Sequence, residues 1–502
     1  MALSERHLCR FVRSVAKKSK RLVSAKTWAF RQRRLSRPNA NGDLNPDWYQ
    51  SMIFPNIAIW GSSDPADPAG RIDRALDDRN HRLSAGLSVT KRFHSVRGAL
   101  VVSQGNGKYI RLRHVVEASS EIPKPIREGC LQFLESEKRQ YEDLAPLLAD
   151  LSEIQAAVVE KLKCEAGKYV DRVLAVSVCD PGVWSTDFDG KVSYRSMCDA
   201  NRLAELSGVS VIDSLPARDL TVGGTGRNIE ALPYWMMFAD RNPRVANRSR
   251  GLIVLGETGL MYTLPASDGL DSEVPEIRMT ETIGFQFLDA LTRKYFPADQ
   301  NLSHIDRLYA DGLEIPELRS RWEKVIADLS PGSQREATSL GGADFDSVAD
   351  KLVAESDQYL NSNSDSFSNL IRTGISWVIE LVFQDLTRQS EVSVGQLKEL
   401  FVSCSPQYEA SVINLLDQRF PGTNVASVRK LGVASEQMGA VVAAVLGLFH
   451  IDQMPANVPW LTGARSQRIL GRLTPGRPSN WRQLLRVMAD FHPAPMKLKD
   501  AI

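Results

Sequence analysis

The chain has 502 residues, of which 43% are hydrophobic and 24% charged, with a formal net charge of +2. This is the composition of a globular protein long enough for two domains, and the near-neutral charge excludes nucleic-acid binding through overall charge. The six cysteines are widely spaced without a CxxC pair, which argues against a zinc site and predicts free thiols in a reducing cytoplasm. No apolar run reaches the ~20 residues of a membrane-spanning helix.

The first 83 residues differ in composition from the rest of the chain. Residues 1–37 carry twelve Lys and Arg and one acid, Glu5, and their spacing predicts a basic helix. We expect a solvated arm; docking onto nucleic acid or an anionic membrane surface is the alternative. No apolar segment follows the charged residues, so a secretory signal is not expected. Residues 38–83 are rich in Pro, Gly, Asp and Ser and predict a linker or extension.

From residue 84 the pattern becomes regular. Residues 84–89 and 96–102 predict two strands around a turn, and residues 109–116 can supply a third. Leucine and isoleucine spacing over residues 125–165 predicts one long amphipathic helix, and residues 173–178 predict a buried strand. The sequence therefore indicates an α/β region that opens with an antiparallel hairpin.

Residues 209–229 combine three features. An apolar, β-branched run over residues 209–212 predicts a buried strand. The carboxylates Asp213 and Asp219 follow, with Arg218 beside the second, and the segment closes on residues 223–226, GGTG. Strand, acid and glycine turn often frame a phosphoryl-transfer site. A plain tight turn, a surface ion pair and a helix cap at Asp219 are the alternatives.

The second half of the chain predicts further helices and strands. A hairpin is expected over residues 252–262, and the spacing of apolar residues alone gives no more than an α/β protein with two lobes and a mixed sheet. No internal repeat is visible. Helices are expected over residues 303–329, 345–360, 367–388, 408–420 and 436–448, and strands over residues 399–403 and 424–425.

The order of these segments resembles the anhydro-N-acetylmuramic acid kinase family over about residues 84–475. The segment LAELSGV at residues 203–209 fits the family's order. The match is specific in two places: residues 209–226, with the acid and glycine segments, and residues 457–471, with NVPWLTGA and ILG. The resemblance implies an α/β, two-lobed actin-like ATPase (ribonuclease H-like) fold with mixed sheets and a central cleft. It places the first lobe at residues 84–245, the second at 246–475 and a C-terminal tail at 476–502.

The resemblance also implies an activity: ATP-dependent phosphorylation of an anhydro amino sugar in cell-wall peptidoglycan recycling, by a cytoplasmic enzyme using ATP and Mg²⁺. A homodimer is the oligomer considered. By family position, Asp213 and Asp219 are the candidate catalytic carboxylates, and no metal-binding side chain is assigned. Substrate-binding candidates are Arg218, Gly223, Gly224 and Gly226, and cofactor-binding candidates are Lys91, Arg92, Gly256 and Thr258.

Several chemical residues depart from the family pattern. By spacing, the family's general base falls on Ser214, and its arginine on Pro216. Residues 254–260 correspond to the family's second phosphate-binding loop, and there Glu257 would stand near the γ-phosphate of ATP. Two like charges ~4 Å apart cost roughly 4 kcal/mol at an effective dielectric constant near 20. We expect Phe285 only to pack, and Gly439 replaces a sugar-contacting glutamate. A pseudokinase that binds or assembles without catalysis is therefore the alternative to a working sugar kinase.

Overall fold

The computed structural model describes ten segments, all within one compact unit formed by residues 55–502. The basic arm predicted over residues 1–37, nearly all of the extension and Glu257 lie outside these segments. The described residues are 81–107, 110–136, 140–240, 249–256, 258–266, 276–295, 312–329, 345–362, 366–389 and 397–490.

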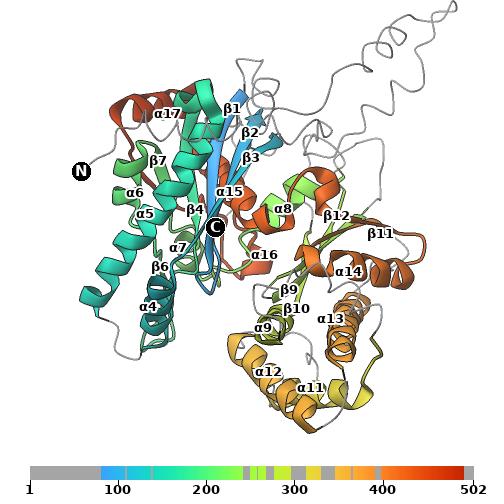
Figure 1. Ribbon diagram of the computed structural model, residues 1–502. Coiled ribbons are helices and arrows are strands. Elements are labelled where there is room, and N and C mark those ends of the chain that lie inside the picture. Colours follow the sequence, from blue (N-terminus) through green and yellow to red (C-terminus); the bar gives the residue numbers. More distant parts are fainter. Residues whose placement is uncertain are drawn as a thin grey trace, which may run out of the picture. The chain divides into compact units, whose positions relative to one another are not determined.

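The first sheet has six strands in the order β13-β7-β4-β1-β2-β3 (Figure 1). Strands β1, β2 and β3 are antiparallel, β4 and β7 continue the sheet parallel to β1, and β13 pairs antiparallel with β7. The predicted opening hairpin is confirmed. The strands are β1 His81–Val89, β2 Ser95–Gln104, β3 Arg111–Glu121, β4 Val173–Cys179, β7 Ser210–Asp213 and β13 Arg472–Thr474.

The second sheet repeats this plan with five strands in the order β10-β9-β8-β11-β12. Again three antiparallel strands are followed by two that run parallel to the first of them. Two mixed sheets confirm the predicted α/β class. The strands are β8 Ser249–Leu255, β9 Thr258–Leu264, β10 Arg278–Ile283, β11 Leu397–Cys404 and β12 Asn424–Ser427.

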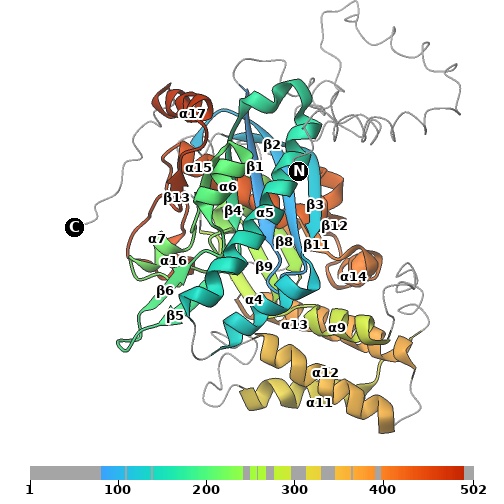
Figure 2. The ribbon, with the colours of Figure 1, turned by 60° about the vertical axis from the view of Figure 1, so that its left-hand side comes forward.

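The long helix predicted over residues 125–165 is two helices, α4 Lys124–Glu135 and α5 Tyr141–Ala166. The first ends because Ser136 adopts an extended backbone, which a continuous helical period does not reveal. Helix α6, Ala200–Ser207, starts at the capping carboxylate of Asp199 and stops at Gly208, whose φ is 69°. A separate hairpin, β5 Val183–Thr186 and β6 Val192–Arg195, precedes it (Figure 2).

The remaining helices agree with most sequence expectations. Helix α17 lies where only a tail was expected. None of the described helices is both long and apolar enough to cross a membrane. Their bounds are α7 Ala217–Leu220, α8 Ala231–Phe238, α9 Gln286–Tyr295, α11 Pro316–Leu329, α12 Phe345–Ser362, α13 Phe367–Gln389, α14 Pro406–Arg419, α15 Met438–Ile451, α16 Pro459–Thr462 and α17 Pro478–Asp490.

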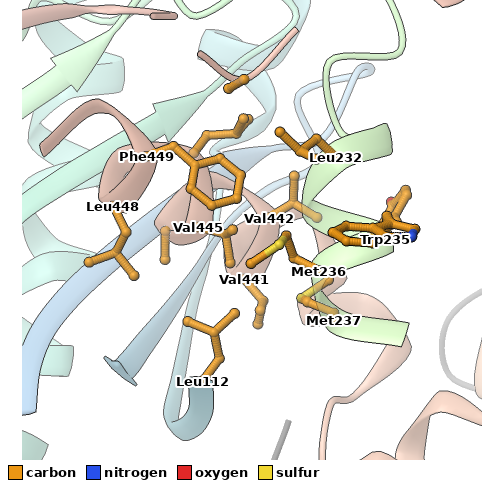
Figure 3. Packing of buried hydrophobic residues seen from close by; sticks show 14 of the residues in the cluster. Leu112, Leu232, Trp235, Met236, Met237, Val441, Val442, Val445, Leu448 and Phe449 are labelled. Atoms are coloured by element: carbon orange, nitrogen blue, oxygen red, sulfur yellow. The ribbon is translucent and has the colours of Figure 1, made fainter. Parts of the chain in front are cut away.

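Helix α15 is the centre of the main core. Its valines and Phe449 pack against Trp235 and Met236 of α8 and against Leu112 of β3 (Figure 3). The same cluster includes Leu252 of β8, so it joins the two sheets. A Cβ on Gly86 would lie 2.0 Å from the carbonyl oxygen of Ala440, so strand β1 and α15 touch backbone to backbone.

A buried ion pair fixes the start of β1 to the end of α15. Arg82 and Asp452 are 4% and 0% exposed, and the guanidinium contacts both carboxylate oxygens. Arg82 Nη2 also donates to the carbonyl of Gly105 at 2.6 Å, while the amide of Gly107 donates to Asp452 at 2.7 Å. The charges are thus paired and hydrogen-bonded inside the protein, as buried charges require.

Candidate functional site

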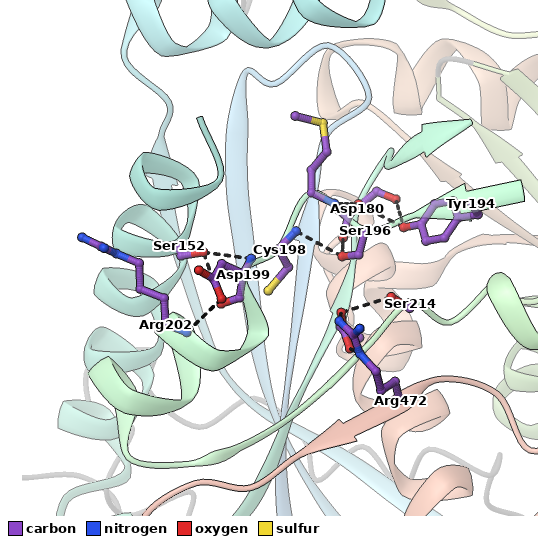
Figure 4. Close-up of polar contacts among 11 residues, drawn as sticks. Ser152, Asp180, Tyr194, Ser196, Cys198, Asp199, Arg202, Ser214 and Arg472 are labelled. Atoms are coloured by element: carbon purple, nitrogen blue, oxygen red, sulfur yellow. Dashed lines mark hydrogen bonds and ion pairs between the residues drawn. The ribbon is translucent and has the colours of Figure 1, made fainter. Parts of the chain in front are cut away.

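The first candidate carboxylate, Asp213, ends strand β7 and is fully buried. Arg472 of the neighbouring strand β13 forms a two-point ion pair with this carboxylate, with Nε 3.1 Å from Oδ1 and Nη2 2.7 Å from Oδ2. Ser214 donates its hydroxyl to Oδ2 at 3.1 Å, and its φ is 54° (Figure 4). The carboxylate is therefore held by two side chains, and the positive φ ends the strand directly after it.

A second carboxylate, Asp180, follows strand β4, which lies beside β7. It accepts hydrogen bonds from the hydroxyls of Tyr194 and Ser196 and from the amide of Met197 (Figure 4). Burial raises the pKa of Asp180, and the nearby charge of Asp213 adds to the rise, against the hydrogen bonds. The sequence analysis predicted the strand over residues 173–178 and gave Asp180 no role. The available signal was an acid directly after a predicted buried strand.

The second candidate carboxylate, Asp219, lies on the short helix α7 and is fully buried. Its Oδ2 accepts the amide of Gly226 at 2.9 Å. Its Oδ1 accepts Asn457 Nδ2 at 2.7 Å and Thr462 Oγ1 at 2.9 Å. The carboxylate thus joins the glycine turn to residues 457–462, so the two segments with the most specific family resemblance meet at Asp219.

The amides of the glycine turn are used inside the protein. Those of Gly223 and Gly224 donate to the carbonyls of Leu220 and Asp219, at 3.0 Å each. The amide of Thr225 donates to the carbonyl of Thr462 at 2.8 Å, and that of Gly226 donates to Asp219. A phosphate-binding loop requires amides that point at the ligand. In this turn the four amides instead donate to acceptors within the protein.

Backbone conformation or lack of space requires glycine at three positions of this turn. Gly223 and Gly226 have φ of 86° and 68°, which favour glycine. A Cβ on Gly224 would lie 2.1 Å from Asp219 Oδ2, so only glycine fits against that carboxylate. Arg218 lies on α7 with an exposed side chain. The structure thus brings Arg218, Asp219 and the three glycines together, and their predicted roles in substrate binding and catalysis stay predictions.

The cofactor candidates Lys91 and Arg92 lie in the turn between β1 and β2. Thr90 organises this turn: its hydroxyl accepts the amides of His94 at 2.8 Å and Ser95 at 3.1 Å. The Phe93 side chain is fully buried at φ 53°. Arg92 Nη2 lies 3.4 Å from Asp350 Oδ1 of α12.

The candidates Gly256 and Thr258 belong to the turn between β8 and β9. The amide of Gly256 donates to the Thr258 carbonyl at 3.1 Å, while its carbonyl accepts the amide of Phe285 at 2.8 Å. Phe285 is buried and packs edge-on against Tyr408, with ring centroids 4.9 Å apart. The expectation that Phe285 only packs is borne out. ATP and Mg²⁺ binding by this turn stays a prediction.

One further position lacks room for the side chain that the resemblance implies there. A Cβ on Gly439 would lie 2.7 Å from Ser88 Oγ, so the place of the family's sugar-contacting glutamate is filled by strand β1. Within the segments that the structure describes, His, Cys, Asp and Glu side chains form no group of three that could hold a metal ion.

Asp289, at the start of α9, accepts hydrogen bonds from Gln407 at 2.9 Å and Tyr408 at 3.0 Å. Burial raises its pKa from 3.8 to about 6, against the lowering effects of Arg293 and both hydrogen bonds. Because the folded pKa lies above the unfolded one, the native state binds the proton more tightly. Its contribution to stability is complete below pH ~4 and is lost as the pH rises through 6.

We therefore expect Asp289→Asn to be more stable than the native chain at pH 7.5, and the difference to vanish near pH 4. The limit set by the pKa shift is about 3 kcal/mol. Urea unfolding at several pH values measures it, with Asp417→Asn on the exposed face of α14 as the control. A difference that does not change with pH would contradict the assignment.

Comparison with known proteins agrees with this picture. The family model for anhydro-N-acetylmuramic acid kinase matches residues 358–476. An anhydro-N-acetylmuramic acid kinase of Salinibacter ruber is 27% identical over 417 residues, covering 80% of this chain and 98% of the relative. One from Synechococcus sp. (strain WH7803) is 25% identical over 362 residues, covering 70% and 89%. One from Synechococcus sp. (strain CC9311) is 22% identical over 398 residues, covering 77% and 97%.

These three matches cover 89–98% of each relative, and the family match includes residues 457–462, which meet the glycine turn at Asp219. The family model and the relatives support a divergent member of the anhydro-N-acetylmuramic acid kinase family, as the sequence resemblance predicted.

Proposed function

We propose that this chain is a pseudokinase: it keeps the scaffold of a sugar kinase as a binding protein and does not transfer a phosphoryl group. The observation that carries this proposal is Asp213. A general base must reach the substrate hydroxyl and accept its proton. Asp213 is buried and holds a two-point ion pair with Arg472, while serine occupies the family's base position.

The nucleotide loops support the same proposal. Phosphoryl transfer depends on positioning and on charge neutralisation by loop amides and Mg²⁺. The amides of the glycine turn, of Gly256 and of His94 donate within the protein. The buried ring of Phe285 adds no polar contact. Each change acts against binding of a nucleotide triphosphate.

A small-molecule amino sugar of the family's type is the ligand we propose for the scaffold, in a cleft between two lobes. The repeated strand plan of the two sheets is consistent with such an arrangement. The second candidate function is a working ATP- and Mg²⁺-dependent sugar kinase. It is favoured by one observation: the alignment covers 98% of the Salinibacter ruber kinase.

The test is direct. The full chain is incubated with Mg-ATP and 1,6-anhydro-N-acetylmuramic acid, and ADP and sugar phosphate are measured together. We expect no sugar phosphate above a protein-free blank. Formation that is lost in Asp213→Asn and kept in the exposed control Asp417→Asn would overturn the proposal and make Asp213 the base. Binding of the sugar without ATP, seen by calorimetry, would support it.

A further inference from the structure

Two segments that lie far apart in the sequence supply positive charge to one edge of the first sheet. Residues 453–489 contain six arginines but no lysine, aspartate or glutamate, and they include the edge strand β13. Residues 214–229, which include α7 and the glycine turn, contain Arg218 and Arg227, and their one acid, Asp219, is fully buried. Neither segment therefore exposes a carboxylate.

Backbone hydrogen bonds hold these segments against each other and against the sheet. The amide of Arg465 donates to the carbonyl of Val222 at 2.9 Å, so Arg465 lies beside the glycine turn. Just before α17, the amide of Arg477 donates to the carbonyl of Gly208 at 3.2 Å. Between these two points, Arg472 lies on β13, which pairs with β7. The contacts place α17, β13 and α7 one after another along the β13 edge of the sheet (Figure 2).

Most of these positive charges are not neutralised inside the protein. Arg472 pairs with the buried Asp213, although its own side chain is 66% exposed. The neighbouring helix α6 exposes one acid, Glu205. Five further exposed arginines form no ion pair with a carboxylate of the described residues, and together with Arg472 they are called the arginine surface. They are Arg218, Arg465, Arg477, Arg482 and Arg486.

The residue types of this surface indicate the kind of partner that it fits. Arginine, unlike lysine, presents a planar fork that can bind two oxygens of one phosphate group. A protein partner would require an apolar centre in the interface. In residues 214–229 and 453–489 the only exposed large hydrophobic side chains are Trp460 and Leu485, which belong to different helices. A row of guanidinium groups without an apolar centre fits a phosphate backbone better than a protein surface.

We propose that the arginine surface binds nucleic acid through its phosphate backbone, without reading the base sequence. An extended chain of phosphates can contact the arginines of α17, β13 and α7 in succession, and each contact releases counterions from the nucleic acid. The net charge of +2 gives no long-range attraction, so binding depends on these local charges, which act within a Debye length of ~10 Å.

This inference goes beyond the proposed function, because it involves no sugar, no nucleotide triphosphate and no phosphoryl transfer. Three of the six arginines, Arg477, Arg482 and Arg486, lie beyond residues 358–476, which the family model matches. Half of the arginine surface is therefore outside the part of the chain that the model describes.

Fluorescence anisotropy of the full chain with a labelled oligothymidylate, in EDTA and at several salt concentrations, tests this site. We expect an affinity that falls as the salt concentration rises. The double variant Arg482→Gln, Arg486→Gln should bind at least tenfold more weakly at low salt. The slope of log affinity against log salt should become shallower by about 1.4, at ~0.7 for each lost phosphate contact. Thermal unfolding of each variant shows whether it is folded.

The matched control is the double variant Arg111→Gln, Lys430→Gln, which removes the same charge from two exposed residues elsewhere. Arg111 lies on β3, the opposite edge strand of the same sheet. The control should bind as the native chain does. All variants keep the basic arm of residues 1–37, so binding through the arm would leave the three affinities equal, and that result would overturn the proposal.

Hydrogen exchange of the native chain, with and without oligothymidylate, locates the bound nucleic acid without any variant. We expect slower exchange in peptides that cover residues 214–226 and 465–489. Protection confined to residues 1–37 would contradict the site. Equal affinity for polyglutamate, or binding to phosphatidylserine vesicles without binding to oligothymidylate, would each overturn the assignment to nucleic acid. Phosphoryl transfer to a sugar would instead overturn the proposed function, so the two failures are distinguishable.

Discussion

Replacing Asp219 with alanine is expected to lower the free energy of unfolding by about 3–5 kcal/mol, because three buried donors lose their acceptor at once. Those donors are the Gly226 amide, Asn457 Nδ2 and Thr462 Oγ1. The loss would also separate the glycine turn from residues 457–462. Denaturant unfolding of the full chain measures the change, and limited proteolysis of the turn reports the local opening.

Asp219→Asn separates a structural from a catalytic role. The amide oxygen can still accept from two of the donors, so we expect it to retain more than half of the stability lost in Asp219→Ala. A catalytic carboxylate that contributes nothing to the free energy of unfolding would behave differently. Both variants would then unfold like the native chain, and any phosphorylated product would disappear in both.

The second large effect is expected at Asp452. Asp452→Ala removes the carboxylate that the buried Arg82 guanidinium contacts through two nitrogens, and should cost about 3–5 kcal/mol. The double variant Arg82→Met, Asp452→Leu removes both charges and restores apolar packing. We expect it to be more stable than Asp452→Ala alone.

Denaturant unfolding of Arg82→Met, Asp452→Leu and the double variant that combines them forms a thermodynamic cycle for this pair. The exposed pair of Lys191 and Asp189 in the β5–β6 hairpin is the matched control, where Asp189→Ala should change stability by less than about 1 kcal/mol. If the losses at Arg82 and Asp452 were simply additive, the two groups would not be acting as a pair.

Much of the fold could be predicted because the apolar pattern is strong. Strand β4 is buried at nearly every position and helix α13 has a continuous apolar stripe, so period and composition were sufficient there. Helix α17 was missed because the residues before it, rich in Pro and Gly, indicate a loop. The repeated strand plan of the two sheets could not be found as an internal sequence repeat. Two sheets of the same topology share an apolar pattern, but they do not need the same residues at corresponding positions.

The site could be predicted only in part. Asp213 and Asp219 follow a predicted strand, so their neighbourhood was accessible from the sequence. Their partners were not, since Arg472 is 259 positions from Asp213 and Asn457 is 238 from Asp219. Local patterns cannot report such pairings. The position of Arg465 beside the glycine turn was missed for the same reason, because two distant loops meet only after the sheet has formed.

Strand β13 bears on how the chain is synthesised. It is built from Arg472–Thr474, yet it pairs with a strand that ends at Asp213. The nascent chain must therefore carry an open β7 edge until residues 472–474 have left the ribosome. Because pairings so distant in sequence form slowly and exposed edges invite aggregation, we expect the pairing of β13 with β7 to be a late and slow step of folding, during which the chain depends on chaperones.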